Sequence, residues 1–152
     1  MEGNDGNIPG VIQVVERSSF NSHPDFMSKQ IVKTHKAPGV IGPFNQGVIA
    51  GNLLFTSGQL PMHPVTGNVP EGIEAQTVQV LENLKAIVEA AGASLQDVVK
   101  TTVYLQRMSD FATVNKIYAT YFREEAPARA CVEVSKMAKD ALVEIEAIAT
   151  LS

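Results

Sequence analysis

The feature that most constrains the fold is the run 98–105, VVKTTVYL, whose alternating β-branched residues are typical of a strand. Alternate side chains of a strand point to opposite faces of a sheet. The expected sets are Val99, Thr101, Val103 and Leu105 on one face and Val98, Thr102 and Tyr104 on the other. Both faces therefore carry apolar groups, and both need a cover.

Two amphipathic helices are predicted around this run. The first, at about 73–91, repeats apolar residues at three- and four-residue spacings, and Gly92 is placed to end it. The second starts at Ser109 or Asp110, which can cap a helix, and Pro127 stops it. Because two helices cover only one face of a sheet, and monomers rarely expose a large apolar patch, we expect an obligate homo-oligomer.

Four more segments have strand composition. Segments 46–50 and 53–57 are separated by Gly51-Asn52, which suits a tight hairpin. Segments 130–134 and 142–150 follow the second helix and are joined by a lysine-rich turn. The predicted order is strand, strand, helix, strand, helix, strand, strand, which is an α+β layout with both helices on one face of the sheet.

The first 26 residues differ in composition from the rest, being rich in Gly, Asn, Ser and Pro. They are neither rich in Arg, as a transit peptide would be, nor built around an apolar centre, as a secretory signal would be. We interpret 1–26 as a leader outside the fold and 27–152 as the domain. The alternative is that 11–15, VIQVV, adds a strand to a sheet edge.

Charge and cysteine content exclude several classes of protein. One Cys and three scattered His argue against a disulfide framework or a structural zinc site, and favour a reducing, intracellular setting. From residue 27 onward there are 12 acidic and 11 basic residues, so the basic excess of nucleic-acid-binding proteins is missing. No run of about 18 apolar residues occurs, so no membrane span is expected.

The segment 127–134, PARACVEV, and the last strand hold the candidate catalytic groups. Arg129 lies between two alanines, and its planar fork suits a substrate carboxylate; pairing with a nearby Glu for structure alone is the alternative. If the last strand pairs antiparallel with this segment, Glu144 or Glu146 faces the same cleft and can activate a water. For Glu146 alone we favour the alternative that it lies on a solvated strand face rather than in a catalytic cleft.

Cys131 shares the strand face of Arg129. A nucleophilic cysteine usually needs a nearby base, and no histidine follows His63. We therefore interpret Cys131 as a small buried hydrophobe rather than a nucleophile.

Seven motifs together resemble the RidA (YjgF) family of reactive-intermediate imine deaminases, over essentially all of 28–152. They are 41–46 (IGPFNQ), 55–61 (FTSGQLP), 84–91, 99–103 (VKTTV), Asp110-Phe111 with Val114-Asn115, 127–134 and 144–149 (EIEAIA). The resemblance implies a chorismate-mutase-like α+β fold with a single mixed sheet. It also implies a homotrimer with active sites between adjacent subunits.

The resemblance further implies roles for individual residues. Arg129 resembles the carboxylate-binding arginine and Glu144 the acid that positions the hydrolytic water. The remaining substrate-binding positions are Phe44, Ser57, Gly58, Asn115 and Cys131. Phe44 departs from the family, which commonly has Tyr there, so a hydroxyl is missing from the pocket.

The activity that the resemblance implies is hydrolysis of short 2-imino acids or their enamine tautomers, such as 2-iminobutanoate and 2-iminopropanoate, to 2-oxo acids and ammonia. No metal or organic cofactor is expected, because an iminium is already electrophilic. The alternative is a carboxylate-binding or chaperone-like trimer without turnover; an endoribonuclease is disfavoured by the near-neutral charge and the lack of a His pair. A cytoplasmic location is expected, with the mitochondrion left open.

Overall fold

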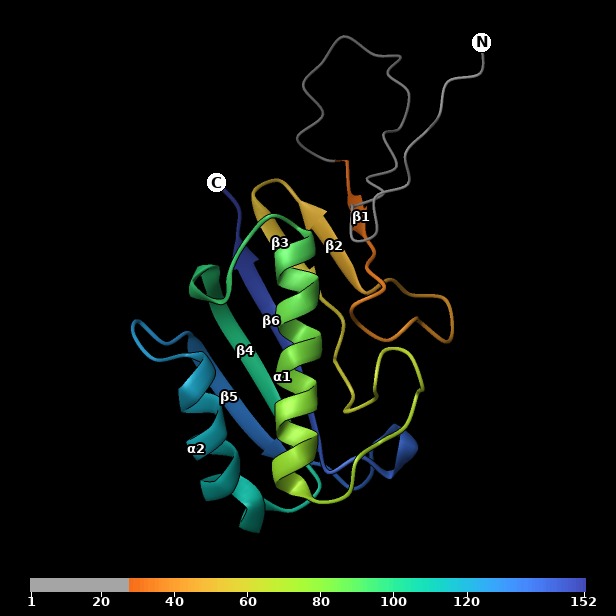
Figure 1. Cartoon of the computed structure of the whole chain (residues 1–152). Helices are drawn as coiled ribbons and strands as arrows, with labels where there is room; N and C mark the ends of the chain where they lie inside the picture. The colour runs from red at the N-terminus through yellow and green to blue at the C-terminus, as the bar shows by residue number, and fades with distance from the viewer. Residues whose placement is uncertain (1–27) are drawn as a thin grey trace, which may run out of the picture.

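The computed structural model describes residues 28–152; the predicted leader and the alternative strand at 11–15 lie outside the described residues. The chain forms one six-stranded sheet and two α-helices (Figure 1). The strands are β1 (Gln30–Val32), β2 (Gly47–Ala50), β3 (Leu53–Thr56), β4 (Val98–Leu105), β5 (Ala128–Glu133) and β6 (Val143–Thr150), and the helices are α1 (Ile73–Ala90) and α2 (Phe111–Tyr121). The strand order is β1-β2-β3-β6-β4-β5, with β4 and β5 parallel and all other pairs antiparallel. The predicted α+β class with a single mixed sheet is confirmed.

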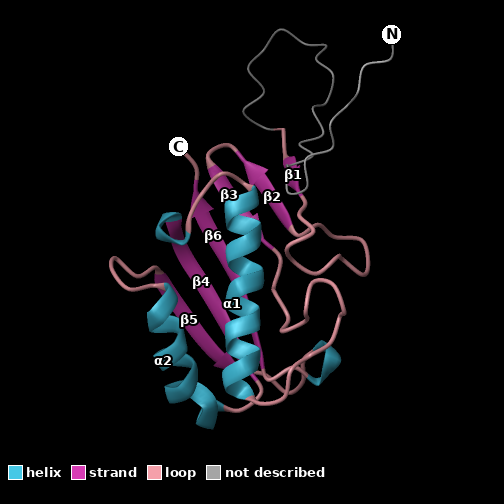
Figure 2. Cartoon of the chain, in the orientation of Figure 1, coloured by secondary structure: helices cyan, strands magenta, loops and turns pink. Residues whose placement is uncertain are grey.

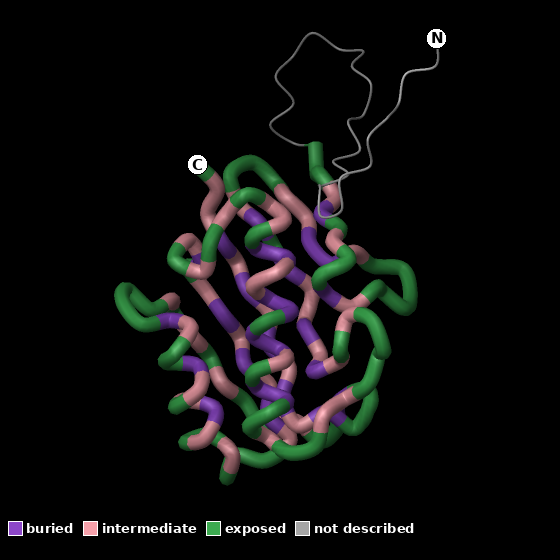
Figure 3. Tube along the Cα trace, in the orientation of Figure 1, coloured by how far each residue is buried: buried purple, intermediate pink, exposed green. Residues whose placement is uncertain are grey.

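Both helices lie on the same face of the sheet, as predicted (Figure 2). The apolar stripe of α1 packs on alternate residues of the central strands. The buried stretches of the trace lie along α1 and along the central strands behind it (Figure 3). The largest fully buried side chains include Leu54, Leu81, Leu84, Ile87, Leu105 and Ile145. We call this side of the sheet the helix face and the other side the open face. No helix within 28–152 is long and apolar enough to cross a membrane.

The position of β5 corrects one prediction. The last two strands were expected to be neighbours, but β4 lies between β5 and β6. The reason is the crossover through α2, which returns the chain parallel to β4 and places β5 on its outer side. β6 then pairs with the other side of β4, so β5 is an edge strand.

A bulge at the start of β4 corrects a second prediction. Val98 pairs with Ala149 and Lys100 with Ile148, so β4 has one extra residue at this point. Such an insertion reverses the alternation of side chains before it. Val98 is therefore buried, at 3% exposure, and Val99 is 44% exposed, which is the reverse of the expected assignment. β1 was not predicted, because three residues are too few to show a pattern.

The open face carries apolar groups without a helix to cover them. Phe55 of β3 is 41% exposed and Val132 of β5 is 42% exposed. Between them, the cross-strand pairs place Tyr104 beside Glu144 and Thr102 beside Glu146. The open face is thus a mixed surface in which two carboxylates are set among apolar and hydroxyl groups.

Candidate active site

Arg129 lies on the helix face of edge strand β5. Its pairing partner Thr101 is fully buried, and the Thr101 hydroxyl lies 2.7 Å from the hydroxyl of Tyr118 on α2. The guanidinium carbon is 4.9 Å from the centre of the Tyr118 ring and 5.4 Å from that of Phe111. These are cation–π distances, so two aromatic rings hold the guanidinium in place.

Arg129 has no acidic partner among residues 28–152, in which the single ion pair joins Lys136 to Asp140. Within the described residues, Arg129 therefore does not form the purely structural ion pair with a Glu that was considered as the alternative. The fork of Arg129 remains available to a carboxylate from outside the chain.

Two other predicted residues lie beside Arg129. Cys131 is half-buried on the same face, where burial raises the pKa of its thiol and the charge of Arg129 partly opposes that rise. Asn115 lies on α2, four residues after Phe111 and three before Tyr118, so it shares the side of the helix that carries both rings. We name Asn115, Arg129 and Cys131, with the rings of Phe111 and Tyr118, the arginine cluster.

Glu144 lies on the open face of β6, directly opposite Tyr104 of β4. Its carboxyl group is half-buried, and burial, with a smaller contribution from the charge of Glu146, raises its pKa above the usual value for glutamate. A carboxyl group of this kind is suited to accept and return a proton near neutral pH.

The segment after β3 brings two more predicted residues, Ser57 and Gly58, toward Glu144. An isolated bridge between Gln59 and Ile145 holds this segment against β6. A Cβ atom at Gly58 would collide with the Glu144 carboxylate, so only glycine allows the backbone to come this close. The Ser57 hydroxyl donates a hydrogen bond of 2.5 Å to the Asn45 carbonyl, next to Phe44, whose side chain is 48% exposed. We name Phe44, Ser57, Gly58 and Glu144 the glutamate cluster.

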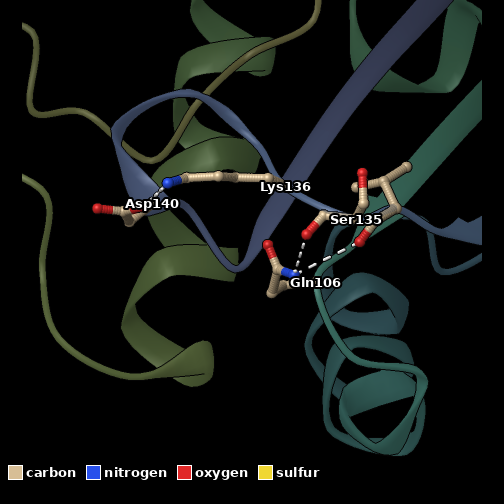
Figure 4. A network of polar contacts seen from close by, with 5 residues as sticks. Gln106, Ser135, Lys136 and Asp140 are labelled. Carbon is tan, nitrogen blue, oxygen red and sulfur yellow. Dashed lines mark hydrogen bonds and ion pairs between the residues drawn. The ribbon is translucent and has the colours of Figure 1, made fainter.

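The turn after β5 forms one wall of a cavity that Glu144 also lines. Figure 4 shows the polar contacts of this turn. The Gln106 side chain donates to the Ser135 carbonyl at 2.9 Å, and Lys136 lies 3.3 Å from Asp140, so the turn is fixed at both ends. A shallow cavity of about 300 Å³ lies between this turn and the sheet. Its lining consists of Tyr104, Val134, Lys136, Met137, Ala138, Glu144 and Glu146.

The structure therefore separates the predicted site into two clusters. Arg129 and Glu144 point to opposite faces of the sheet, and β4 lies between their strands. The prediction that the last two strands bring an acid into the cleft of Arg129 is wrong within one chain. The cause is the strand order together with the pairing register: Arg129 pairs with Thr101 on the helix face of β4, whereas Glu144 pairs with Tyr104 on its open face.

Sequence reasoning missed the neighbours that support each cluster. Phe111 and Tyr118 were not connected with Arg129, although their seven-residue spacing and the face of Arg129 could have indicated stacking. Tyr104 was assigned to the second strand face without a partner, but its hydroxyl donates to Glu146 at 2.6 Å. That bond depends on the register between β4 and β6, which the sequence does not reveal. Within 28–152, no three His, Cys, Asp or Glu side chains gather closely enough to hold a metal ion.

Comparisons with known proteins agree with this fold. The family model for endoribonuclease L-PSP matches residues 34–151. The chain is 54% identical over 126 residues to the 2-iminobutanoate/2-iminopropanoate deaminase of Escherichia coli, covering 81% of this chain and 98% of that protein. It is 48% identical to the structure of E. coli TdcF with bound serine, with a TM-score of 0.78 and coverage of 80% and 98%.

The structure of RidA from the Antarctic bacterium Psychrobacter is 47% identical, with a TM-score of 0.79 over 80% of this chain and 99% of that one. These similarities extend over nearly the whole length of each relative. The chain belongs to the endoribonuclease L-PSP family, the family of RidA.

Proposed function

We propose that this protein hydrolyses short 2-imino acids, or their enamine tautomers, to 2-oxo acids and ammonia. The substrate class is supported by the E. coli relative named 2-iminobutanoate/2-iminopropanoate deaminase. The observation that carries the proposal is Arg129, which is held between two aromatic rings and has no acidic partner within 28–152. An arginine prepared in this way suits the carboxylate of a small imino acid.

The proposed mechanism uses the two clusters in turn. The fork of Arg129 binds the substrate carboxylate and fixes the orientation of the imine. Glu144 accepts a proton from a water as the water oxygen attacks C2 of the protonated imine and the C=N electron pair moves to nitrogen, which gives a carbinolamine. Glu144 then returns the proton to nitrogen, the C–N bond breaks, and ammonia leaves as Glu144 takes the proton of the remaining hydroxyl, which becomes the 2-oxo group; Glu144 passes this proton to the released ammonia or to solvent. The water supplies the new carbonyl oxygen, so no other reactant is needed.

We further propose that each active site combines the arginine cluster of one subunit with the glutamate cluster of the next, in a homotrimer. One chain cannot present both clusters to one small substrate, because they lie on opposite faces of its sheet. The free edge of β5 and the exposed Phe55 and Val132 offer the surface that such contacts bury. A contact between two different patches repeated around a ring closes into a cyclic oligomer.

Subunit complementation tests this composite site. Arg129→Ala and Glu144→Gln are each expected to lose turnover of 2-iminobutanoate, generated by a threonine dehydratase, by about 100-fold or more. When the two variants are unfolded, mixed in equal amounts and refolded, random assembly gives about a quarter of the sites both intact residues. The mixture is therefore expected to recover about a quarter of the wild-type rate.

The controls separate the parts of the proposal. Refolding each variant alone must leave it inactive, and sedimentation velocity must give a trimer for the mixture. If the mixture stays as inactive as its parents while it forms trimers, the composite site is wrong. If Arg129→Ala retains the wild-type rate, the assignment of Arg129 as the group that binds the substrate carboxylate is wrong. If the wild type itself does not turn over 2-iminobutanoate, the deaminase function is wrong.

Two other functions give different outcomes. A carboxylate-binding protein without catalysis would bind 2-oxobutanoate in the same cleft and show no turnover. A ribonuclease would bind RNA with a steep dependence on salt, which the near balance of acidic and basic residues does not favour. We place the protein in the cytoplasm on the ground of its single free cysteine.

A further inference from the structure

We propose that Tyr104 and Glu146 are positioning residues for Glu144, acting as a hydroxyl–carboxylate pair that prepares the neighbouring acid for proton transfer. This inference rests on the deaminase function proposed above, because it assigns a task to Glu144. Neither Tyr104 nor Glu146 is expected to touch the substrate in this role.

The pairing of β4 with β6 sets the three side chains in one small group. Tyr104 lies directly opposite Glu144, and Glu146 is two residues farther along the same face of β6. The Tyr104 hydroxyl donates to Glu146 Oε1 at 2.6 Å, so its ring crosses diagonally from the position of Glu144 to that of Glu146. All three residues line the cavity of about 300 Å³ beside the turn after β5.

The bond from Tyr104 fixes where the charge of Glu146 lies. The hydrogen bond to Glu146, burial, and the charges of Glu146 and Glu144 raise the pKa of Tyr104 to about 12, so its hydroxyl keeps its proton and continues to donate at neutral pH. The charge of Glu146 in turn opposes ionisation of Glu144. A carboxyl group that both accepts and returns a proton works best when its pKa is closer to the working pH.

Other charged groups near Glu144 have different partners or positions. Lys136 lies across the cavity in the turn after β5, but it is paired with Asp140 and mostly exposed. Lys100 is on the same sheet face beyond Glu146 and lines a neighbouring hollow with it. The other described residues placed beside Glu144 contribute no charge there: the segment after β3 brings Gly58 against its carboxylate, and Val134, Met137 and Ala138 line the same cavity. Glu146 is thus the like charge that acts on Glu144.

The test combines a direct titration with a pH–rate profile. The carboxyl carbon of Glu144 is followed by NMR in ¹³C-glutamate-labelled full-length protein, for the wild type, Glu146→Gln, Tyr104→Phe and the double variant. Glu146→Gln removes the opposing charge, so Glu144 is expected to titrate at lower pH, and the acidic limb of the kcat profile to move the same way. The rate at neutral pH is expected to fall by about tenfold or less, a part of what a general acid–base group contributes.

Tyr104→Phe keeps the ring and removes only the hydroxyl, so Glu146 is free to turn away from Glu144. Its expected shift has the same direction and is smaller. Because Tyr104 acts through Glu146, the double variant is expected to behave as Glu146→Gln alone. Glu133→Gln is the matched control, since it removes an equal charge from the helix face of β5 and is expected to leave the Glu144 titration unchanged.

The outcomes distinguish this inference from the function on which it rests. If the Glu144 carboxyl group titrates at the same pH in Glu146→Gln as in Glu133→Gln, the positioning role is wrong, whatever the activity of the variants. If the shift of the Glu144 titration in the double variant equals the sum of the shifts in the two single variants, Tyr104 acts independently of Glu146. That result also overturns the proposed pair. A wild-type protein that does not turn over 2-iminobutanoate contradicts the deaminase function, while the titration still decides whether the three residues are coupled.

Discussion

The two faces of the sheet are made by the same strands and have opposite properties. On β6, Val143 and Ile145 point to the helix face and are completely buried, whereas Glu144 and Glu146 point to the open face and are half-buried. The helix face is closed by α1 and α2, and at its border the edge strand β5 places two charged residues, Arg129 and Glu133. Alternate residues of one strand thus contribute to the hydrophobic core on one face and to the candidate site on the other.

The difference teaches why the proposed site is divided. A closed apolar layer cannot accommodate a small polar substrate, so the arginine cluster lies where α2 and the edge strand meet solvent. The open face has room for carboxylates because no helix covers it. Each cluster occupies the part of its face that its chemistry requires, and the sheet between them prevents contact within one chain.

The largest effect is expected from a matched pair of substitutions on β6. Ile145→Ala empties a fully buried position on the helix face and is expected to lower the free energy of unfolding by about 2–5 kcal/mol. Ile148→Ala removes the same groups from the half-buried open face and is expected to cost about 1 kcal/mol. Urea denaturation at fixed protein concentration measures both. Equal losses would contradict the division of the sheet into a packed and an open face.

The next effect tests the close contact in the glutamate cluster. Gly58→Ala places a methyl group where the Glu144 carboxylate lies, so the carboxylate must move. Displacing a reacting group by about 1 Å is expected to reduce kcat about 100-fold. Gly39→Ala is the control, because a Cβ there meets nothing within 4 Å. If both variants keep the wild-type kcat, Glu144 does not need its present position.

A smaller effect is expected in the arginine cluster. Arg129→Lys keeps the charge but loses the planar fork and its stacking on Phe111 and Tyr118. The loss of hydrogen bonds to the substrate carboxylate is expected to raise KM by about 10- to 100-fold. Initial-rate measurements over a range of substrate concentrations check this. An unchanged KM would mean that only the charge of Arg129 matters.

The smallest effect concerns the stability cost of the open face. Glu144 has a raised pKa in the folded chain, so its favourable contribution to folding exists in acid and is lost as the pH rises through the folded-state value. Glu144→Gln avoids that loss and is expected to be more stable than the wild type at neutral pH, by about 1 kcal/mol or less because the group is half exposed. The difference should vanish below the ordinary pKa of glutamate. Denaturation curves at pH 7 and in acid provide the comparison; a variant less stable at pH 7 would contradict the raised pKa.

Much of the fold could be predicted from local patterns. The stripe of α1, the hairpin at Gly51-Asn52 and the placement of both helices on one face follow from periodicity and turn chemistry. The order of the last strands could not, because it depends on which side of β4 a crossover occupies. The bulge at Val98 and Val99 also escaped, since both residues suit either face.

For the site, residue type carried more information than arrangement. Arg129 was singled out by its unusual place between two alanines, whereas the choice of Glu144 over Glu146 came from the resemblance to the RidA family. The structure stacks Arg129 on two rings and half-buries Glu144. Their grouping depended on strand neighbours far apart in the sequence, and there the prediction was wrong. The proposed roles of Phe44, Asn115 and Cys131 in substrate binding stay predictions.

The sheet that separates Arg129 from Glu144 also has a consequence for the life of the protein in the cell. In the proposed assembly, a newly synthesised or diluted chain carries two half-sites that are each inactive. Turnover begins only when subunits associate and complete the active site. The specific activity should then fall on dilution below the assembly constant, so that the abundance of the protein, and not only that of its substrate, governs how fast reactive imines are removed.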